Sequence, residues 1–434
     1  MRDDEPIGHL IRPACEARGW GPAKLARELG IAEGRGPDGL SRQYVRKWMA
    51  GEREPDYWRL YLVQVLDLES LQVGDNAEPI DAVVDTVASV IDVGRSDVQR
   101  RDFLAGSSAY ALSALALPDL AAIERRTRTA RAGAVRVGVG EVQAVRQMAR
   151  VLGDAAAEHG GGHARHLVVR YLTEDVAGWL NGRFTAAVGS ELFAATSQLA
   201  HLAGWMAQDE GNQGRAQQYY VHAHKLAAEA GDPELSATAL RGLAVQAIDL
   251  GYRAVAVRLA EKCVEQARHL SDPRAVSYYQ TTLADAAAHD GDRATAARAL
   301  GASQTAIERS SLVPGESWAS HFDIGRWAHH SGMILARLGD FDGASEHLHQ
   351  ALEIHGLDRR RSRAIVLADL GQVQLRQGDP DAAFATWGEF VDCAEGIKSV
   401  KVHDAAQDMH ARLGRYESVA EAQELREQAA RLAL

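Results

Sequence analysis

Apolar residues near the start of the chain recur at the three- and four-residue spacing of amphipathic helices. The pattern predicts two helices within residues 7–30, the second beginning at Pro22 and ending at Gly30. A third helix is expected over residues 41–50, with Ser41 as its N-cap, and a fourth follows it. The residues expected on the buried faces are Ile7, Leu10, Ile11, Ala14 and Ala17 in the first helix and Val45, Trp48 and Met49 in the third.

The C-terminal half carries an internal repeat of small residues. Five glycines recur at spacings of 40, 40, 48 and 39 residues. A small residue lies seven positions before each glycine, and an alanine lies five positions after it. Small residues let two helices approach closely and glycine makes the turn, so each unit is predicted to be a helical hairpin. The three columns are Gly211, Gly251, Gly291, Gly339 and Gly378; Gly204, Ala244, Ala284, Gly332 and Gly371; and Ala216, Ala256, Ala296, Ala344 and Ala383.

Three further features relate to this repeat. Asp-Pro pairs at 232–233 and 272–273 fall at the same phase of successive units. A degenerate sixth unit around Gly414 is expected to cap the array. Residues 179–188 contain the same step from glycine to alanine but lie closer to the next unit, so their membership stays open.

The composition agrees with an all-α protein. The chain has 434 residues, 46% of them hydrophobic and 25% charged, with 11 prolines and 7 phenylalanines. Three cysteines lie far apart, which predicts neither a disulfide framework nor a zinc site and suits a reducing cytoplasm. The acidic start MRDDEPIGHL does not resemble a signal peptide, and no stretch is apolar for long enough to span a bilayer.

The charge is unevenly distributed along the chain. The net charge is −11, which argues against indiscriminate coating of nucleic acid. Residues 12–59 contain ten Lys or Arg against seven Asp or Glu, a net charge of +3, which leaves about −14 for the remainder. A locally positive N-terminal unit on an acidic body suits DNA binding confined to one end.

The N-terminal pattern resembles the XRE-type (Cro-like) helix-turn-helix. The segment Lys24-Leu25-Ala26 is followed by a helix-ending glycine, a capped second helix and the phrase WMAGEREP. The sequence departs from that motif in the longer segment IAEGRGPDGL between the two helices, which leaves the angle of the second helix less certain. The resemblance implies that helix 41–50 lies in the major groove of a double-stranded DNA operator.

The outward face of that helix supplies the candidate DNA contacts. Arg42 and Gln43 have the chemistry to read guanine and adenine edges. Arg46, Lys47 and Arg53 suit phosphates, and the helix N-terminus can hold another. The full set of predicted DNA-binding residues is Ser41, Arg42, Gln43, Tyr44, Arg46, Lys47 and Arg53.

The repeats resemble tetratricopeptide repeats, as in ARLGDFDGASEHLHQAL and LRQGDPDAAFATWGEF. Their spacing exceeds the usual 34 residues, which implies longer loops or helices. The resemblance predicts an all-α fold in which a helix-turn-helix domain (1–70) precedes a linker with connector helices (71–120), a helical region whose membership in the repeats stays open (121–195) and a tetratricopeptide-repeat α-solenoid (196–434).

Tetratricopeptide stacks present the first helix of each hairpin along a concave groove. Three groove columns follow from the repeat phase, and one of them grades from acidic to basic, which suits a ligand with separated charges such as a peptide with free termini. The predicted ligand-binding residues are His201, Trp205, Asp209, Arg241, Asp249, Asp285, His289, His329, Met333, Arg337, Gln372 and Arg376. Solvated surface charge is an equally open interpretation for each of them.

Several motifs are set aside. His159, His163 and His166 lie in a glycine-rich segment without a carboxylate or cysteine at ligand spacing, so no metal site is predicted. GVGEVQA (138–144) lacks the preceding strand of a dinucleotide loop, and no Walker loop or nucleophile elbow occurs, so neither an enzyme nor a cofactor is predicted. The twin-arginine-like run at 99–119 is interrupted by glycine and serines and follows the N-terminal unit, so a connector is favoured over an export signal.

This layout resembles ligand-responsive transcription regulators. It is similar to the peptide-sensing regulators of Gram-positive bacteria (the Rap, Rgg, NprR, PlcR and PrgX group) and, through GGGHARHLVVRYL and WMAGEREPDYWR, to the XRE–tetratricopeptide regulators of actinomycetes. The resemblance implies a cytoplasmic homodimer on an inverted-repeat operator, with a signalling peptide or small molecule in the groove. The alternative is a tetratricopeptide adaptor that sequesters a partner protein, with the N-terminal bundle as a docking module.

Overall fold

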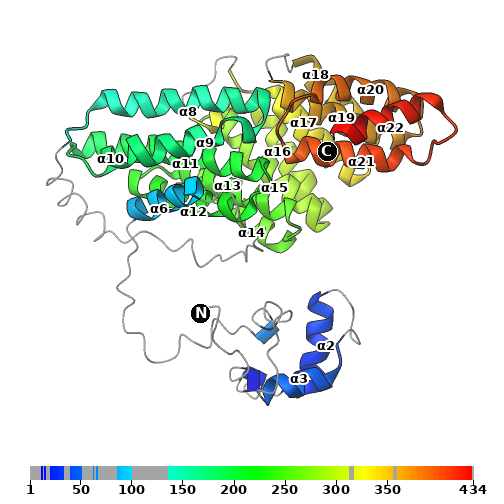
Figure 1. Cartoon of the computed structure of the whole chain (residues 1–434), viewed down its shortest axis with the longest axis horizontal. Coiled ribbons are helices and arrows are strands. Elements are labelled where there is room, and N and C mark those ends of the chain that lie inside the picture. The colour runs from blue at the N-terminus through cyan, green and yellow to red at the C-terminus, as the bar shows by residue number, and fades with distance from the viewer. Residues whose placement is uncertain are drawn as a thin grey trace. The chain divides into compact units, whose positions relative to one another are not determined.

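The computed structural model shows an all-α protein whose chain divides after Val83 into two units (Figure 1). The residues that it describes are 11–12, 14–15, 20–33, 40–50, 62, 65–66, 86–99, 135–311, 317–354 and 359–432. Within them the only strand-like feature is an isolated bridge between Arg136 and Arg183. The fold class expected from the sequence, helices in a solenoid of hairpins, is confirmed.

The first unit contains α2 (Pro22–Glu33) and α3 (Arg42–Met49), which pack against each other. Helix α2 begins at Pro22 as expected, but the prediction that it ends at Gly30 is wrong, because three more helical residues follow. Glycine lowers helix propensity by about 1 kcal/mol without breaking the hydrogen-bond ladder, and the residues after it are compatible with a further turn.

The core of this unit combines four segments of the sequence. Ile11, Ala14 and Cys15 are buried with residues of α2 and α3 and with Leu62 and Leu66. The other residues predicted for the first helix (Ile7, Leu10 and Ala17) and the start of the fourth helix lie outside the described residues.

The second unit begins with α6 (Thr86–Gln99), which packs on α9 and α12. Ser89 Oγ lies 3.2 Å from His222 Nε2, and Gly94 is so close to Thr173 that a Cβ would collide with its methyl group. The twin-arginine-like run begins at Gln99, the last residue of α6, and its remainder is outside the described part of the chain.

The region expected to be helical ahead of the repeats forms a four-part layer. It consists of α8 (Val139–His159), α9 (Gly161–Tyr171), a π-helical turn (Leu172–Val176) and α10 (Ala177–Leu180). Both α8 and α9 pack on the first repeat helix, so this layer extends the hydrophobic core of the array at its start.

Six helical hairpins follow, and the helices of each pair pack mainly against each other (Figure 1). The hairpin bounds are α11 (Ala186–Asp209) with α12 (Gln213–Ala230), α13 (Pro233–Asp249) with α14 (Arg253–Ala267), α15 (Pro273–Asp290) with α16 (Arg293–Ile307), α17 (Ile324–Leu338) with α18 (Phe341–Ile354), α19 (Arg360–Gln377) with α20 (Pro380–Ala394), and α21 (Val400–Leu413) with α22 (Ala420–Leu432). The long repeat spacing therefore reflects helices of up to 18 residues between successive turn glycines.

The repeat columns have the structural roles expected of them. All five turn glycines have φ between 79° and 89°, the left-handed region that glycine adopts without strain. All five alanines of the third column are fully buried. Asp232 and Asp272 cap α13 and α15, each with proline in the first turn.

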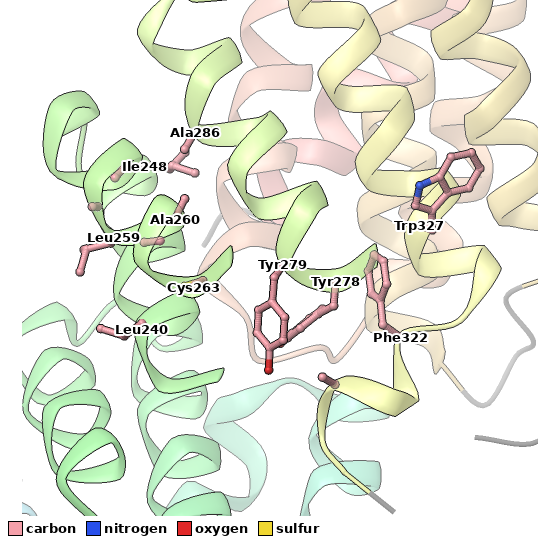
Figure 2. Close-up of a cluster of buried hydrophobic side chains, with 14 of the residues drawn as sticks. Leu240, Ile248, Leu259, Ala260, Cys263, Tyr278, Tyr279, Ala286, Phe322 and Trp327 are labelled. Atoms are coloured by element: carbon pink, nitrogen blue, oxygen red, sulfur yellow. The ribbon is translucent and has the colours of Figure 1, made fainter. Parts of the chain in front are cut away.

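The 48-residue spacing arises from an insertion before α17. It contains the short 3-10 helix η3 (Ala319–His321), which packs on α15. The largest core cluster runs beneath it, and Figure 2 shows Tyr278 and Tyr279 of α15 beside Phe322 at the end of this insertion.

Candidate functional site

The exposed face of α3 is the candidate DNA-binding surface. Ser41 Oγ accepts a hydrogen bond from the Gln43 amide at 3.4 Å, which starts the helix where expected. Val45 and Trp48 are buried against the cluster that includes Leu25 and Leu29, which fixes the rotation of the helix about its axis.

The opposite face carries every described residue predicted to contact DNA. These residues are all exposed: Ser41, Arg42, Gln43, Tyr44, Arg46 and Lys47. Helix α3 contains three cationic side chains and no acidic one. Arg53 lies outside the described residues. The surface therefore has the charge and hydrogen-bonding groups for a nucleic-acid backbone and base edges.

The predicted ligand residues lie on the first helices of the hairpins. These helices contact one another in turn, α11 on α13, α13 on α15 and α15 on α17. Side chains of first helices far apart in sequence also meet: Lys401 of α21 lies 3.3 Å from the Asp249 carboxylate of α13. The first helices therefore line the inner side of the curved array.

The repeat pattern predicted that Asp209 lines the groove, but the structure places its side chain in a buried ion pair. Its side chain is 1% exposed and forms a bidentate ion pair with Arg361 of α19, 152 residues away. Ser399 Oγ donates to the same carboxylate at 2.8 Å, and the Gly161 amide donates at 2.9 Å. The carboxylate is thus used to join the two ends of the array, where the Lys398 amide also donates to the His159 carbonyl at 2.9 Å.

A second group of predicted residues gathers around Asp249 and Asp285. Gln208 Nε2 donates to Asp249 at 2.7 Å, and His289 Nε2 lies 3.5 Å from Asp285. Burial raises the pKa of Asp285, although His289 and Arg337 oppose the shift. Burial lowers the pKa of His289. The column predicted to grade from acid to base is here a mixed-charge cluster, completed by Lys401.

His201 and Arg241 form a third group. His201 is 5% exposed, and burial followed by the charge of Arg241 lowers its pKa to about 3. The Arg241 guanidinium lies over the Tyr278 ring at 4.1 Å. His201 is therefore neutral near pH 7 beside a charged arginine.

The remaining predicted residues are more dispersed. His329 Nε2 lies 2.8 Å from the Asp369 carboxylate, and Trp205 stacks beneath the Arg361 guanidinium at 5.1 Å. Met333 and Gln372 are half-buried. Arg376 is exposed and lies over Phe341 of its neighbouring hairpin at 5.4 Å. The structure thus separates the predicted set into several clusters.

Sequence reasoning missed the residues that complete these clusters. Arg361, Ser399 and Lys401 do not belong to the groove columns, because their partners come from hairpins at the other end of the array. Trp318 lies in the insertion before α17, and Arg326 lies in the first turn of that helix. The one signal of the insertion in the sequence was the 48-residue spacing.

The motifs set aside have ordinary structural roles. Gly138 is the N-cap of α8, and its amide donates to Glu141 at 2.7 Å. The His159 and His163 rings lie 4.8 Å apart. No group of three or more His, Cys, Asp or Glu in the described ranges could hold a metal ion. Among the same residues, no helix has the length and apolar character needed to cross a membrane.

Comparison with known proteins supports the repeat architecture. A tetratricopeptide-repeat family model matches residues 323–386, which run from the N-cap of α17 into the first half of α20. The chain therefore contains tetratricopeptide repeats, arranged as a helical solenoid. No curated protein matches the chain.

Buried histidines predict a pH dependence of stability. Burial, reinforced by Lys225, lowers the pKa of His222 to about 4, and the pKa of His201 is about 3. Below pH 6.5 the unfolded chain binds protons that the folded chain does not, so the free energy of unfolding falls as the pH drops. Each histidine should account for a loss of about 2 kcal/mol between pH 7.5 and pH 5.

Urea unfolding at these two pH values measures the effect. His222→Gln keeps a polar group near Ser89 and should reduce the pH-dependent loss by about 2 kcal/mol. His166→Gln, at an exposed position, should leave the loss unchanged. Equal pH dependence in wild type and His222→Gln would contradict the assignment.

Proposed function

We propose that this chain is a sequence-specific DNA-binding transcriptional regulator whose tetratricopeptide repeats bind a partner and dimerise. The observation that carries the proposal is the α3 surface, where six exposed residues include three cations and no acid. The capped N-terminus of α3 and its buried Val45–Trp48 edge suit a recognition helix held rigidly by α2.

Dimerisation follows from the geometry of DNA recognition. One helix-turn-helix reads only a half-site, and a two-fold symmetric pair reads an inverted repeat with half-sites about 34 Å apart or at a multiple of that distance. The repeats are the larger unit and supply the surface for the second copy. A peptide or small molecule on their inner side would change DNA affinity only if it binds one arrangement of the repeats better than another.

The experiment is a mobility shift with the DNA upstream of the chain's own gene, in excess competitor DNA. Arg42→Ala combined with Arg46→Ala should weaken specific binding by at least about 100-fold, since base-edge and phosphate contacts each contribute about 1–3 kcal/mol. Arg27→Ala, an exposed arginine on α2, is the matched control and should bind normally. Sedimentation should show the same oligomer for all three proteins.

Unchanged binding by the double variant would reject the assignment of α3 as the recognition helix. A second candidate function is an adaptor that captures a partner protein, which the tetratricopeptide match favours. In that case the wild-type chain would not shift its upstream DNA, and genomic binding would recover no enriched inverted repeat.

A further inference from the structure

The Arg241 guanidinium has no counter-ion among the residues that the structure describes. It projects from α13, and its closest ring contact is the Tyr278 face at 4.1 Å. Its Nε is buried and donates to no acceptor among the described residues, and no described carboxylate forms an ion pair with it. A buried donor left without an acceptor destabilises the fold by about 1–3 kcal/mol, and more when it is charged.

The Tyr278 ring beside this guanidinium belongs to a cluster of aromatic side chains from several elements. His201 of α11 has its ring 4.9 Å from Trp318 and 5.2 Å from Tyr220. Trp318 Nε1 donates to the Tyr278 hydroxyl at 3.2 Å. Tyr278 in turn faces Phe322 at 5.2 Å, as Figure 2 shows. The rings form a continuous wall beside the charge.

A second buried polar atom without a hydrogen-bond partner among the described residues lies in the same cluster of rings. His201 is 5% exposed, and its buried Nδ1 has no hydrogen-bond partner in the described part of the chain. Two polar groups within electrostatic range of each other, one on α11 and one on α13, therefore lack partners among the described residues. Native proteins satisfy most buried polar groups, so a coincidence of two indicates a bound group or ordered water at this place.

Positive charge accumulates around this position. Arg326 of α17 lies within electrostatic range of Arg241 and of Asp323, and its Nη1 donates to the His321 carbonyl at 3.4 Å. The nearby Asp323 carboxylate is bound by Arg359 at 2.7 Å. Burial, followed by the charge of Arg241, lowers the pKa of His330 well below its ordinary value, so this histidine adds no charge near pH 7.

We propose that Arg241, His201 and the rings of Tyr278 and Trp318 form a binding site for a carboxylate attached to an apolar or aromatic group. The guanidinium fork matches the two oxygens of a carboxylate, and the rings accept a flat apolar body. Asp249, which acts electrostatically on Tyr220 together with Arg241, disfavours a doubly charged phosphate relative to a single carboxylate. The source is either a small organic acid or the carboxyl terminus of a peptide.

This inference deepens the proposed function by naming the ligand chemistry of the repeats, and it is tested without DNA. Isothermal titration of the full-length protein would compare phenylacetate with phenylacetamide, and the tripeptide alanyl-alanyl-phenylalanine with its C-terminal amide. At least one carboxylate should bind at least about tenfold more tightly than its amide, the loss expected for a charged hydrogen bond. The tighter of the two acids identifies the source, and phenyl phosphate should bind more weakly than phenylacetate.

Arg241→Met removes the charge while keeping an unbranched side chain. It should weaken carboxylate binding by about 10- to 100-fold and leave the melting temperature without ligand unchanged or higher, because an unpaired cation is lost. Arg258→Met, on the exposed face of α14 in the same hairpin, is the matched control and should bind normally.

Three results would overturn the site: equal affinity for acids and amides, full affinity in Arg241→Met, or a lower melting temperature of that variant with no change in carboxylate affinity. The last result would make Arg241 a structural residue. Each is independent of the mobility shift, so a carboxylate site can fail while DNA binding stands, and the reverse also holds.

Discussion

Asp209→Ala is expected to lower the free energy of unfolding of the repeat unit by about 3–5 kcal/mol, the effect of removing one partner from a buried ion pair. The substitution leaves the Arg361 guanidinium, whose side chain is 10% exposed, without a counter-ion. It also removes the acceptor of the Ser399 hydroxyl and of the Gly161 amide. Urea unfolding measures the loss.

The contacts that Asp209 makes between the two ends of the array are called the closure, and the same substitution should open it. The Lys398 amide, which donates to the His159 carbonyl, should exchange hydrogen faster in Asp209→Ala than in wild type. Amides in the middle of α15 should lose less protection, because their contacts do not depend on the closure.

Two controls distinguish the loss of this ion pair from a general destabilisation of the fold. Asp209→Ala combined with Arg361→Met removes both charges and should recover part of the lost stability. Glu191→Ala breaks the exposed pair with Arg146 and should change stability by less than about 1 kcal/mol. If Asp209→Ala were as stable as wild type and kept its Lys398 protection, Asp209 would not hold the closure.

Gly371→Ala is expected to destabilise the repeat unit by about 2 kcal/mol through overpacking. A Cβ at this position would collide with the Trp387 indole nitrogen and lie 2.5 Å from its Cδ1. Trp387 is 1% exposed, and its Nε1 donates to the Ala368 carbonyl at 3.3 Å, so the ring is held on all sides. Thermal and urea unfolding both report the change.

Gly388 of the same hairpin provides the matched control. It lies in the interior of α20, and a Cβ there would meet nothing within 4 Å. Gly388→Ala should therefore raise stability by about 0.5–1 kcal/mol through helix propensity alone. Equal effects of the two substitutions would show that Gly371 is not required for close approach of α19 and α20.

Three of the five repeat units have glycine where a Cβ would meet the second helix of the hairpin. Sixteen residues after Gly204, Gly332 and Gly371 stand Tyr220, Leu348 and Trp387, and these are the side chains that a Cβ would meet. The same offset leads from Ala244 to Ala260 and from Ala284 to Leu300, so alanine at this position occurs with both a small and a large partner. Glycine thus marks the hairpins in which a large side chain of the second helix packs directly on the first.

The sequence alone was sufficient for features that depend on neighbouring residues. Helix starts follow from Ser41, Asp232 and Asp272, turns from glycines in the left-handed region, and the exposed face of α3 from the spacing of Val45 and Trp48. The helix end at Gly30 was misjudged, because a glycine outside a left-handed turn only weakens a helix.

Asp209 and Asp249 show what only the tertiary structure decided. They occupy the same repeat position, yet Asp209 is buried against Arg361 and Asp249 stays partly exposed beside Lys401. Hairpin sequences fix each helix pair, but the curvature of the array is the sum of small rotations at every interface. The residues that meet across its inner side therefore depend on all intervening hairpins, and no local pattern in the sequence contains that sum.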